Sequence, residues 1–183
     1  LMQLGRKKAN LNHKLMTPVF IVESVRTPRA RANENGGLHN LNPYELLDVL
    51  YKDISKKNFL NLHSIDEVIL GCVTQYGEQA GNIAKSSSLF SGYPDSISGL
   101  TINRFCSSSL DAINLGYLKI YSKQADNVIA GGVEMMSRVP MLSDNAEIWS
   151  NVALATQAKI FLMGSGADLI ASLFKISRDE VDM

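Results

Sequence analysis

The residue whose type and position best suit covalent chemistry is Cys106. The segment GLTINRFCSSSLD, from Gly99 to Asp111, begins with a strand-like run that leads directly into the cysteine. At a helix N-terminus, unpaired backbone N–H groups and the positive end of the helix dipole favour a thiolate over a thiol. The same groups can stabilise the oxyanion of a tetrahedral acyl intermediate. Cys106 is therefore a candidate nucleophile for acyl transfer, and the alternative is a buried cysteine that only fills space.

The helix that positions this cysteine is the clearest in the sequence. It is expected from about Cys106 to Lys123 and to be buried, because four apolar residues recur on one face: Leu110, Ile113, Tyr117 and Ile120. Ser107, Ser108 and Ser109 are small enough to let a thioester approach the sulfur. One of them is expected to cap the free N–H groups of the helix.

Around this segment, strand-like and helix-like stretches alternate along the chain. Helices are expected from Pro43 and over 81–90, and strands over 19–25, 68–70, 100–104 and 128–130. Parallel strands need crossover connections, which helices usually supply. The sequence therefore predicts an α/β fold, with a mixed, mostly parallel sheet covered by helices. Beyond Val139 the pattern becomes helical and irregular, which places a boundary near Ser137.

The composition limits the classes of partner. The chain has 183 residues, 45% of them hydrophobic, and 18 basic residues balance 18 acidic ones. No net field attracts nucleic acid or an anionic membrane, and no apolar run reaches the roughly 18 residues that span a bilayer. The two cysteines, Cys72 and Cys106, form neither a disulfide framework nor a metal-ligand spacing. We expect a small-molecule ligand, no metal and a reducing compartment, either the cytoplasm or an organellar matrix.

Several motifs in order resemble the thiolase family. TINRFCSSSLDAI resembles the active-site segment of thiolases, and VESVRTPRA resembles their first strand and Arg-Thr-Pro turn. GCVTQYGEQAGNIAK resembles the stretch before the active-site strand, and AGGVEMMSRVP resembles the Gly-Gly-x-Glu-x-Met-Ser motif. LMGSGADLIASLFKISRDEVD resembles part of the thiolase loop domain, so the resemblance covers Val19 to Asp182. Among thiolases, the EQAGNIAK and GGVEMMSRVPM segments most resemble those of the degradative 3-ketoacyl-CoA thiolases of fatty-acid β-oxidation.

The resemblance implies roles for particular residues. Cys106 would be the acyl-accepting nucleophile, its backbone N–H would belong to an oxyanion hole, and Met163 would line the pocket for coenzyme A and the acyl group. Coenzyme A would be a substrate, no further cofactor would be needed, and the protein would be a homodimer or homotetramer. Leu162 replaces a frequent His, and Ser109 a frequent Gly, so acyl-chain selectivity does not follow from the resemblance.

The resemblance also implies a division of the chain and an incomplete catalytic apparatus. It implies an N-terminal α/β domain over 17–137 and part of a loop domain over 138–183. The first 15 residues are basic, lack acidic residues and precede Met16, so an extension is expected over 1–16, either a start-site remnant or a targeting peptide. The family's Gly-His-Pro, Cys-x-Gly-Gly-Gly and Asn-Glu-Ala motifs, which supply the base, the second cysteine and an asparagine, do not occur in this sequence. About half of the enzyme is therefore expected to be absent, and the isolated chain is expected to be inactive.

Two other interpretations remain. A β-ketoacyl synthase-like condensing enzyme also fits the Cys-Ser-Ser-Ser-Leu segment, although Asn103-Arg104 and the Glu134-Met135-Met136-Ser137 run disfavour it. A non-catalytic assembly module fits the absent base. Cys72 is expected to be a packed strand residue, and Glu134 to have a structural hydrogen-bonding role.

Overall fold

A three-stranded parallel sheet lies at the centre of the first part of the chain. The computed structural model describes residues 18–56 and 61–183. The strands are β1 (Glu67–Gly71), β2 (Ser98–Ile102) and β3 (Val128–Gly132), in the order β2-β1-β3. β1 pairs in parallel with both neighbours, so that Ile69 lies beside Leu100 on one side and beside Ala130 on the other.

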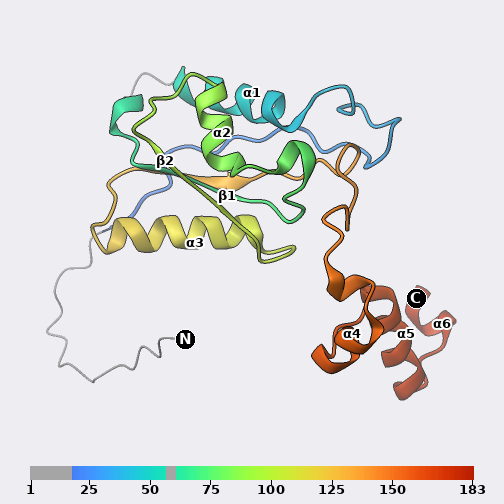
Figure 1. Ribbon diagram of the computed structural model, residues 1–183. Coiled ribbons are helices and arrows are strands. Elements are labelled where there is room, and N and C mark those ends of the chain that lie inside the picture. The colour runs from blue at the N-terminus through green and yellow to red at the C-terminus, as the bar shows by residue number, and fades with distance from the viewer. Residues whose placement is uncertain (1–17, 57–60) are drawn as a thin grey trace, which may run out of the picture. The chain divides into compact units, whose positions relative to one another are not determined.

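Helices cover both faces of this sheet. α1 (Pro43–Ser55) and α2 (Ile83–Phe90) lie on one face, and α3 (Ser108–Tyr121) lies on the other (Figure 1). α2 contacts β2 and β1, and α3 contacts β3 and β1. Helices that connect parallel strands fall on the faces of the sheet. The predicted α/β class, with its mostly parallel sheet, is therefore confirmed.

The main hydrophobic core lies between β1 and the α1–α2 layer. All residues of β1 are buried, as a central parallel strand requires. Val68 and Leu70 contribute to a buried cluster with Tyr51 of α1 and Ile83 of α2. Short 3-10 turns, η1 (Leu62–Ser64) and η2 (Gly77–Gln79), flank β1 along the chain. The sequence prediction of a strand at 68–70 is confirmed.

α1 begins where the sequence predicts. The Asn42 side chain accepts a hydrogen bond from the Glu45 backbone N–H at 3.0 Å, and the Glu45 carboxylate accepts one from the Asn42 N–H at 2.7 Å. This capping box satisfies N–H groups that the helix leaves unpaired. Pro43 is the first helical residue, where its missing N–H costs nothing.

The predicted strand at 19–25 is not formed. Residues 18–25 have no regular secondary structure, and Ile21 is 84% exposed. A β-branched run indicates that a segment can pair at a sheet edge, but it does not supply the edge. The expected extension over 1–16 lies outside the described residues.

Residues Leu142–Met183 form a second compact unit, separate from Leu1–Met141. It contains η3 (Glu147–Trp149), α4 (Val152–Ala158), α5 (Met163–Phe174) and α6 (Arg178–Asp182), and none of its residues is in a strand. The helical character expected after Val139 is confirmed. The units divide at 141/142, whereas the sequence places a domain boundary near Ser137.

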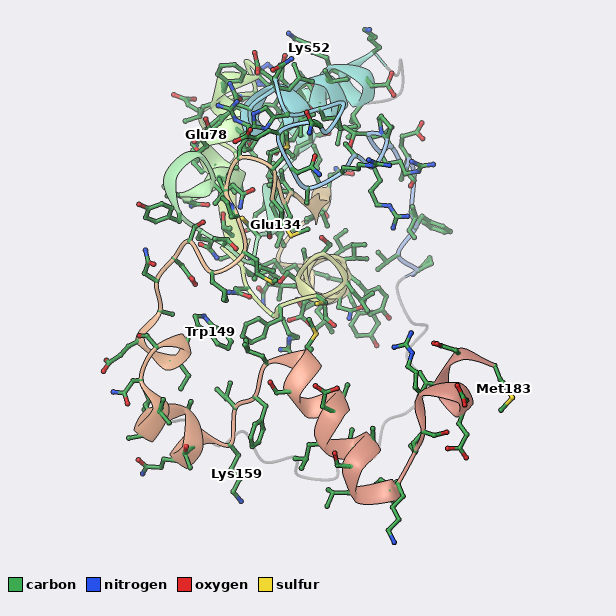
Figure 2. The ribbon with its side chains drawn as sticks, turned by 90° about the vertical axis from the view of Figure 1, so that its right-hand side faces the viewer. Lys52, Glu78, Glu134, Trp149, Lys159 and Met183 are labelled. Carbon is green, nitrogen blue, oxygen red and sulfur yellow. The ribbon has the colours of Figure 1, made fainter. Side chains whose placement is uncertain are left out.

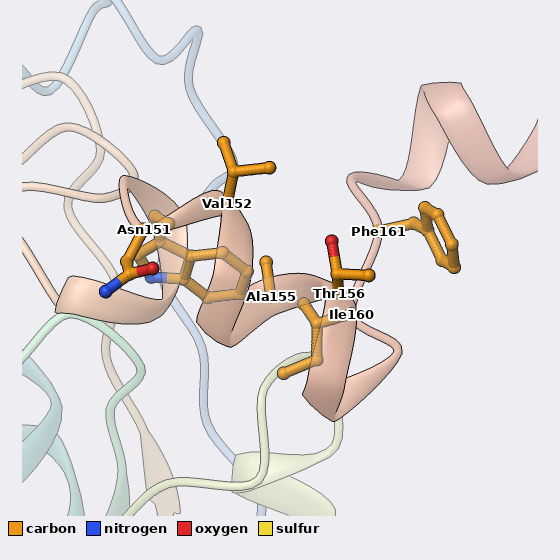
Figure 3. A pocket seen from close by; sticks show the side chains of 7 residues that line it. Asn151, Val152, Ala155, Thr156, Ile160 and Phe161 are labelled. Atoms are coloured by element: carbon orange, nitrogen blue, oxygen red, sulfur yellow. The ribbon is translucent and has the colours of Figure 1, made fainter.

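The second unit contains a cavity of about 280 Å³ (Figure 3), and Trp149 is one of the residues that line it. Its other lining residues come from α4 and the segments beside it: Asn151, Val152, Ala155, Thr156, Ile160 and Phe161. Most of these side chains are apolar, so the cavity would favour an apolar group over a charged one.

Within the described ranges, 18–56 and 61–183, no helix combines the length and the apolar character needed to cross a membrane.

Candidate active site

Cys106 lies in the turn between β2 and α3. The first residue of α3 is Ser108, so the cysteine precedes the helix by two positions instead of opening it. Cys106 is exposed and is not in a disulfide. The helix begins within two residues of the expected position. The expected burial is wrong, because Cys106 is exposed and only Ser108, Ala112 and Gly116 of α3 are buried.

The start of α3 lies directly against the ends of β1 and β3. A Cβ built on Gly71 would come within 2.4 Å of the Ser109 backbone nitrogen, and one built on Gly132 would come within 2.0 Å of the Ser109 hydroxyl oxygen. Both glycines are the last residues of their strands. Their missing side chains allow α3 to begin at the carboxyl end of the sheet, where ligand sites of α/β proteins are commonly built.

α3 turns a different face to the sheet from the one that periodicity predicts. Its buried residues are small: Ser108, Ala112 and Gly116. Residues of the predicted apolar stripe point outward, with Leu110 exposed by 60% and Tyr117 by 44%. Close approach explains the reversal, because a Cβ on Gly116 would already lie 3.2 Å from the Val128 side chain, closer than ordinary van der Waals contact.

The turn before Cys106 is strained and is held by two side chains. Phe105 has a φ of 48°, in the left-handed region that non-glycine residues seldom occupy. The Phe105 N–H donates to Asn103 Oδ1 at 2.8 Å. Ser108 Oγ donates to the Phe105 carbonyl at 2.6 Å and accepts from the Arg104 N–H at 2.8 Å. Such a conformation persists when its surroundings fix it, and it concentrates at functional sites.

The three serines have distinct roles. Ser107 is the N-cap residue of α3, but its side chain makes no capping hydrogen bond. Ser108 is buried and stabilises the turn, and Ser109 lies against Gly132. The expected side-chain cap is therefore not formed. The Ser108 hydroxyl binds the Arg104 N–H and the Phe105 carbonyl of the turn instead of an N–H group of the helix.

Behind the turn, a polar cluster joins the ends of β1 and β3. Glu134 is labelled in Figure 2. Its carboxylate accepts from the Val73 N–H at 2.8 Å and from Gln79 Nε2 at 2.8 Å. Gln79 is fully buried, and its Oε1 accepts from the Met135 N–H at 2.6 Å. These bonds confirm the structural hydrogen-bonding role predicted for Glu134.

The second cysteine differs from Cys106 in its surroundings. Cys72 directly follows β1, is 1% exposed, and receives a hydrogen bond at its sulfur from Gln79 Nε2 at 3.6 Å. Burial raises the pKa of the Cys72 thiol to about 12, and the nearby Glu134 carboxylate adds to the shift. Cys72 is therefore an inert packing residue at neutral pH, as the sequence predicts.

Met163 is the first residue of α5 in the second unit and is 78% exposed. The residues that line the nearby cavity include Ile160 and Phe161. The role of Met163 at a coenzyme A pocket stays a prediction. Among the described residues, no group of His, Cys, Asp and Glu side chains has the size and closeness of a metal site.

Sequence reasoning missed the part that Asn103 plays in holding the turn. Asn103 Nδ2 donates to the Val73 carbonyl at 3.1 Å while its Oδ1 binds Phe105. The Asn-Arg-x-Cys pattern marks Asn103 as part of a motif. Nothing in the pattern indicates that its partner lies 30 positions earlier in the chain.

Comparison with known proteins identifies the relatives of this chain. Residues 19–183 match the family model described as "Thiolase, N-terminal domain". A 3-ketoacyl-CoA thiolase of Colwellia psychrerythraea is 39% identical over 171 residues, which cover 91% of this chain and 43% of that protein. A 3-oxoadipyl-CoA/3-oxo-5,6-dehydrosuberyl-CoA thiolase of Escherichia coli is 36% identical and is covered over 45% of its length.

A solved structure agrees with this assignment. The crystal structure of the Bacillus anthracis acetyl-CoA acetyltransferase superimposes with a TM-score of 0.53 and 39% sequence identity, covering 56% of this chain and 26% of that chain. The chain spans less than half the length of the curated relatives named above. The match over residues 19–183, together with these relatives, shows that the chain belongs to the thiolase family.

Proposed function

We propose that this protein is a thiolase-type acyltransferase that acts through an acyl thioester on Cys106. In the degradative direction the Cys106 sulfur attacks the 3-keto carbon of a 3-ketoacyl-CoA. The bond between C2 and C3 breaks, acetyl-CoA leaves after C2 takes a proton, and the acyl group stays on sulfur. The thiol of coenzyme A then attacks the thioester, which releases acyl-CoA and returns Cys106. The reverse sequence is a condensation.

The single observation that carries this proposal is the placement of Cys106. Its thiol is exposed in a strained turn immediately before the N-terminus of α3, a helix of 14 residues. Helix-terminal N–H groups can stabilise the oxyanion of the attacked carbonyl. We assign the Cys106 backbone N–H as one donor to that oxyanion. The names of the relatives support a 3-ketoacyl-CoA substrate.

Complete turnover needs a base and a proton donor, and the family motifs that supply them do not occur in this sequence. Without a base only a small fraction of a thiol is ionised at neutral pH, so acylation by acetyl-CoA is slow, and cleavage of a 3-ketoacyl-CoA also needs a proton for its C2 carbon. We propose that these groups, and part of the coenzyme A pocket, come from outside the 183 residues. Met163 is proposed to contact the coenzyme A or acyl moiety, and the working assembly is proposed to be a homodimer or homotetramer.

Acylation of Cys106 is the direct test. The chain is incubated with acetyl-CoA, and the acetylated peptide is located by mass spectrometry. The expected product is a thioester on Cys106, with one free coenzyme A released for each acyl group transferred. Cys106→Ala should abolish the modification, and Cys72→Ala, the matched control, should leave it unchanged.

A non-catalytic assembly role is the second candidate, because α3 presents apolar side chains at the surface of the first unit. Absence of any acylation at Cys106, even with the partner half of a thiolase added, would favour this role over the acyltransferase.

A further inference from the structure

A continuous series of hydrogen bonds joins Glu134, two residues beyond β3, to the turn that carries Cys106. Glu134 Oε2 accepts from the Val73 N–H at 2.8 Å. The Val73 carbonyl accepts from Asn103 Nδ2 at 3.1 Å, and Asn103 Oδ1 accepts from the Phe105 N–H at 2.8 Å. A side-chain amide can donate and accept at once, so Asn103 connects the two ends.

The Glu134 end of this series is anchored. Gln79, fully buried, donates from Nε2 to Glu134 Oε1 at 2.8 Å and to the Thr74 carbonyl at 2.8 Å. Its Oε1 accepts from the Met135 N–H at 2.6 Å. Each polar atom of Gln79 therefore has a fixed partner. The carboxylate of Glu134 is held against the Val73 N–H, and the Val73 peptide is held in turn.

The Cys106 end is the part that needs support. Phe105, with a φ of 48°, makes the peptide bond to Cys106, so its conformation sets the direction of the Cys106 N–H and of the sulfur. A left-handed non-glycine residue relaxes when its fixing contacts are removed. Ser108 provides one set of contacts from within the same turn. Asn103 provides the contact that reaches Val73, two residues beyond β1.

We propose that Glu134 is a positioning residue for Cys106 and that it acts through the Val73 peptide and the Asn103 side chain. This role rests on the proposed function, because it assumes that Cys106 is the nucleophile and that its backbone N–H is an oxyanion donor. In this proposal Glu134 contacts neither the substrate nor the Cys106 sulfur. Its charge is used to hold one peptide group, and the Asn103 amide transmits the constraint to the turn.

Substitutions at two exposed residues each remove a different hydrogen bond of the series. Glu134→Gln replaces one carboxylate oxygen by an NH₂ group, which then faces donors such as Gln79 Nε2. Asn103→Asp keeps the oxygen that binds the Phe105 N–H but loses the donor to the Val73 carbonyl. Asn103 is exposed, so we expect the variant to fold. Gln75→Ala is the control, because Gln75 binds the neighbouring Cys72 carbonyl at 3.2 Å without joining the series.

Two reactions of the full chain are measured for each variant: alkylation of Cys106 by iodoacetamide, and acylation of Cys106 by acetyl-CoA. Alkylation needs only the thiol, whereas acylation also needs the N–H donor in place. Glu134→Gln should slow acylation by about tenfold, the size expected for losing one charge-assisted hydrogen bond, and slow alkylation less. Gln75→Ala should leave the ratio of the two rates unchanged. A general loss of stability would change the rates of both reactions alike, and thermal unfolding of each variant would detect it.

The decisive comparison is a double-mutant cycle. If Glu134 acts through Asn103, then Glu134→Gln should have almost no further effect on the Cys106 rates in the Asn103→Asp background. An equal effect of Glu134→Gln in both backgrounds, or no effect in either, would overturn the proposal. Acetyl-CoA failing to acylate the unmodified chain would count against the proposed function. In that case the same double-mutant cycle, measured with the alkylation rates of Cys106, would still test the positioning role.

Discussion

The backbone of Gly132 lies against the side chain of Ser109, so close that a Cβ on the glycine would come within 2.0 Å of the Ser109 hydroxyl oxygen. The same Cβ would lie 2.7 Å from the Gly71 carbonyl oxygen, which a rotation of the serine cannot relieve. The end of the sheet and the start of α3 therefore meet with no room between them, and Cys106 is placed by that contact.

Gly132→Ala should accordingly displace the start of α3. The free energy of unfolding should fall by about 1–3 kcal/mol, the range for adding a methyl group where there is no space. Acylation or alkylation of Cys106 should slow with it. Gly131→Ala is the matched control, since a Cβ there meets nothing within 4 Å. Chemical denaturation measures both variants, and equal values for the two would contradict the close packing.

The two thiols should react in a fixed order. Cys106 is exposed, whereas burial holds the pKa of Cys72 at about 12. Limiting iodoacetamide near neutral pH should therefore modify Cys106 well before Cys72, because only the thiolate reacts and access is needed. Peptide mapping by mass spectrometry reads both sites in one sample. Equal or reversed labelling of the folded chain would show that Cys106 is not a prepared nucleophile.

The free energy of unfolding should decrease at alkaline pH. Burial raises the pKa of Cys72 from 9.0 to about 12, and that of Tyr51 from 10.0 to about 12. Each group is neutral when protonated, so its contribution is complete below the unfolded pKa and is lost as pH rises through the folded one. Denaturation midpoints between about pH 9 and about pH 12 test this window. Cys72→Ala should flatten the lower part of the decline, and an unchanged slope would argue against thiol burial.

The isolated chain should self-associate. Ile113 and Tyr117 are outward-facing apolar side chains on α3, exposed by 45% and 44%. Large exposed apolar patches seldom stay free in solution. Light scattering at micromolar concentration should show species larger than the monomer, and Tyr117→Lys should reduce them. Asn114→Lys, a charge added at an exposed polar position of the same helix, is the control. A monodisperse monomer would contradict the prediction.

The chain of 183 residues should not turn over 3-ketoacyl-CoA on its own, because no motif for the base or the second acid is present in it. Coenzyme-A-dependent cleavage of acetoacetyl-CoA and of a longer 3-ketoacyl-CoA should equal the background of Cys106→Ala. Turnover that Cys106→Ala abolishes would show that this sequence contains a base which the motifs do not reveal.

The sequence by itself determined the α/β class, the strands at 68–70 and 128–130, the helix that follows Cys106 and the family. Those features depend on local information: a run of apolar β-branched residues, apolar residues at helical spacing, or a motif read in order. Cys106 could be singled out for the same reason, since its neighbours along the chain are also its neighbours in the turn.

Only the tertiary structure decided which face of α3 is buried and what holds Cys106. Apolar periodicity records which side chains can be buried, but close contact with Gly71 and Gly132 selects the face with the smallest residues. The run at 19–25 has the composition of a strand and forms none in the described chain. Glu134 binds a peptide N–H 61 positions away, and no local pattern encodes that distance. Long-range pairing depends on how the layers pack, which one segment alone does not specify.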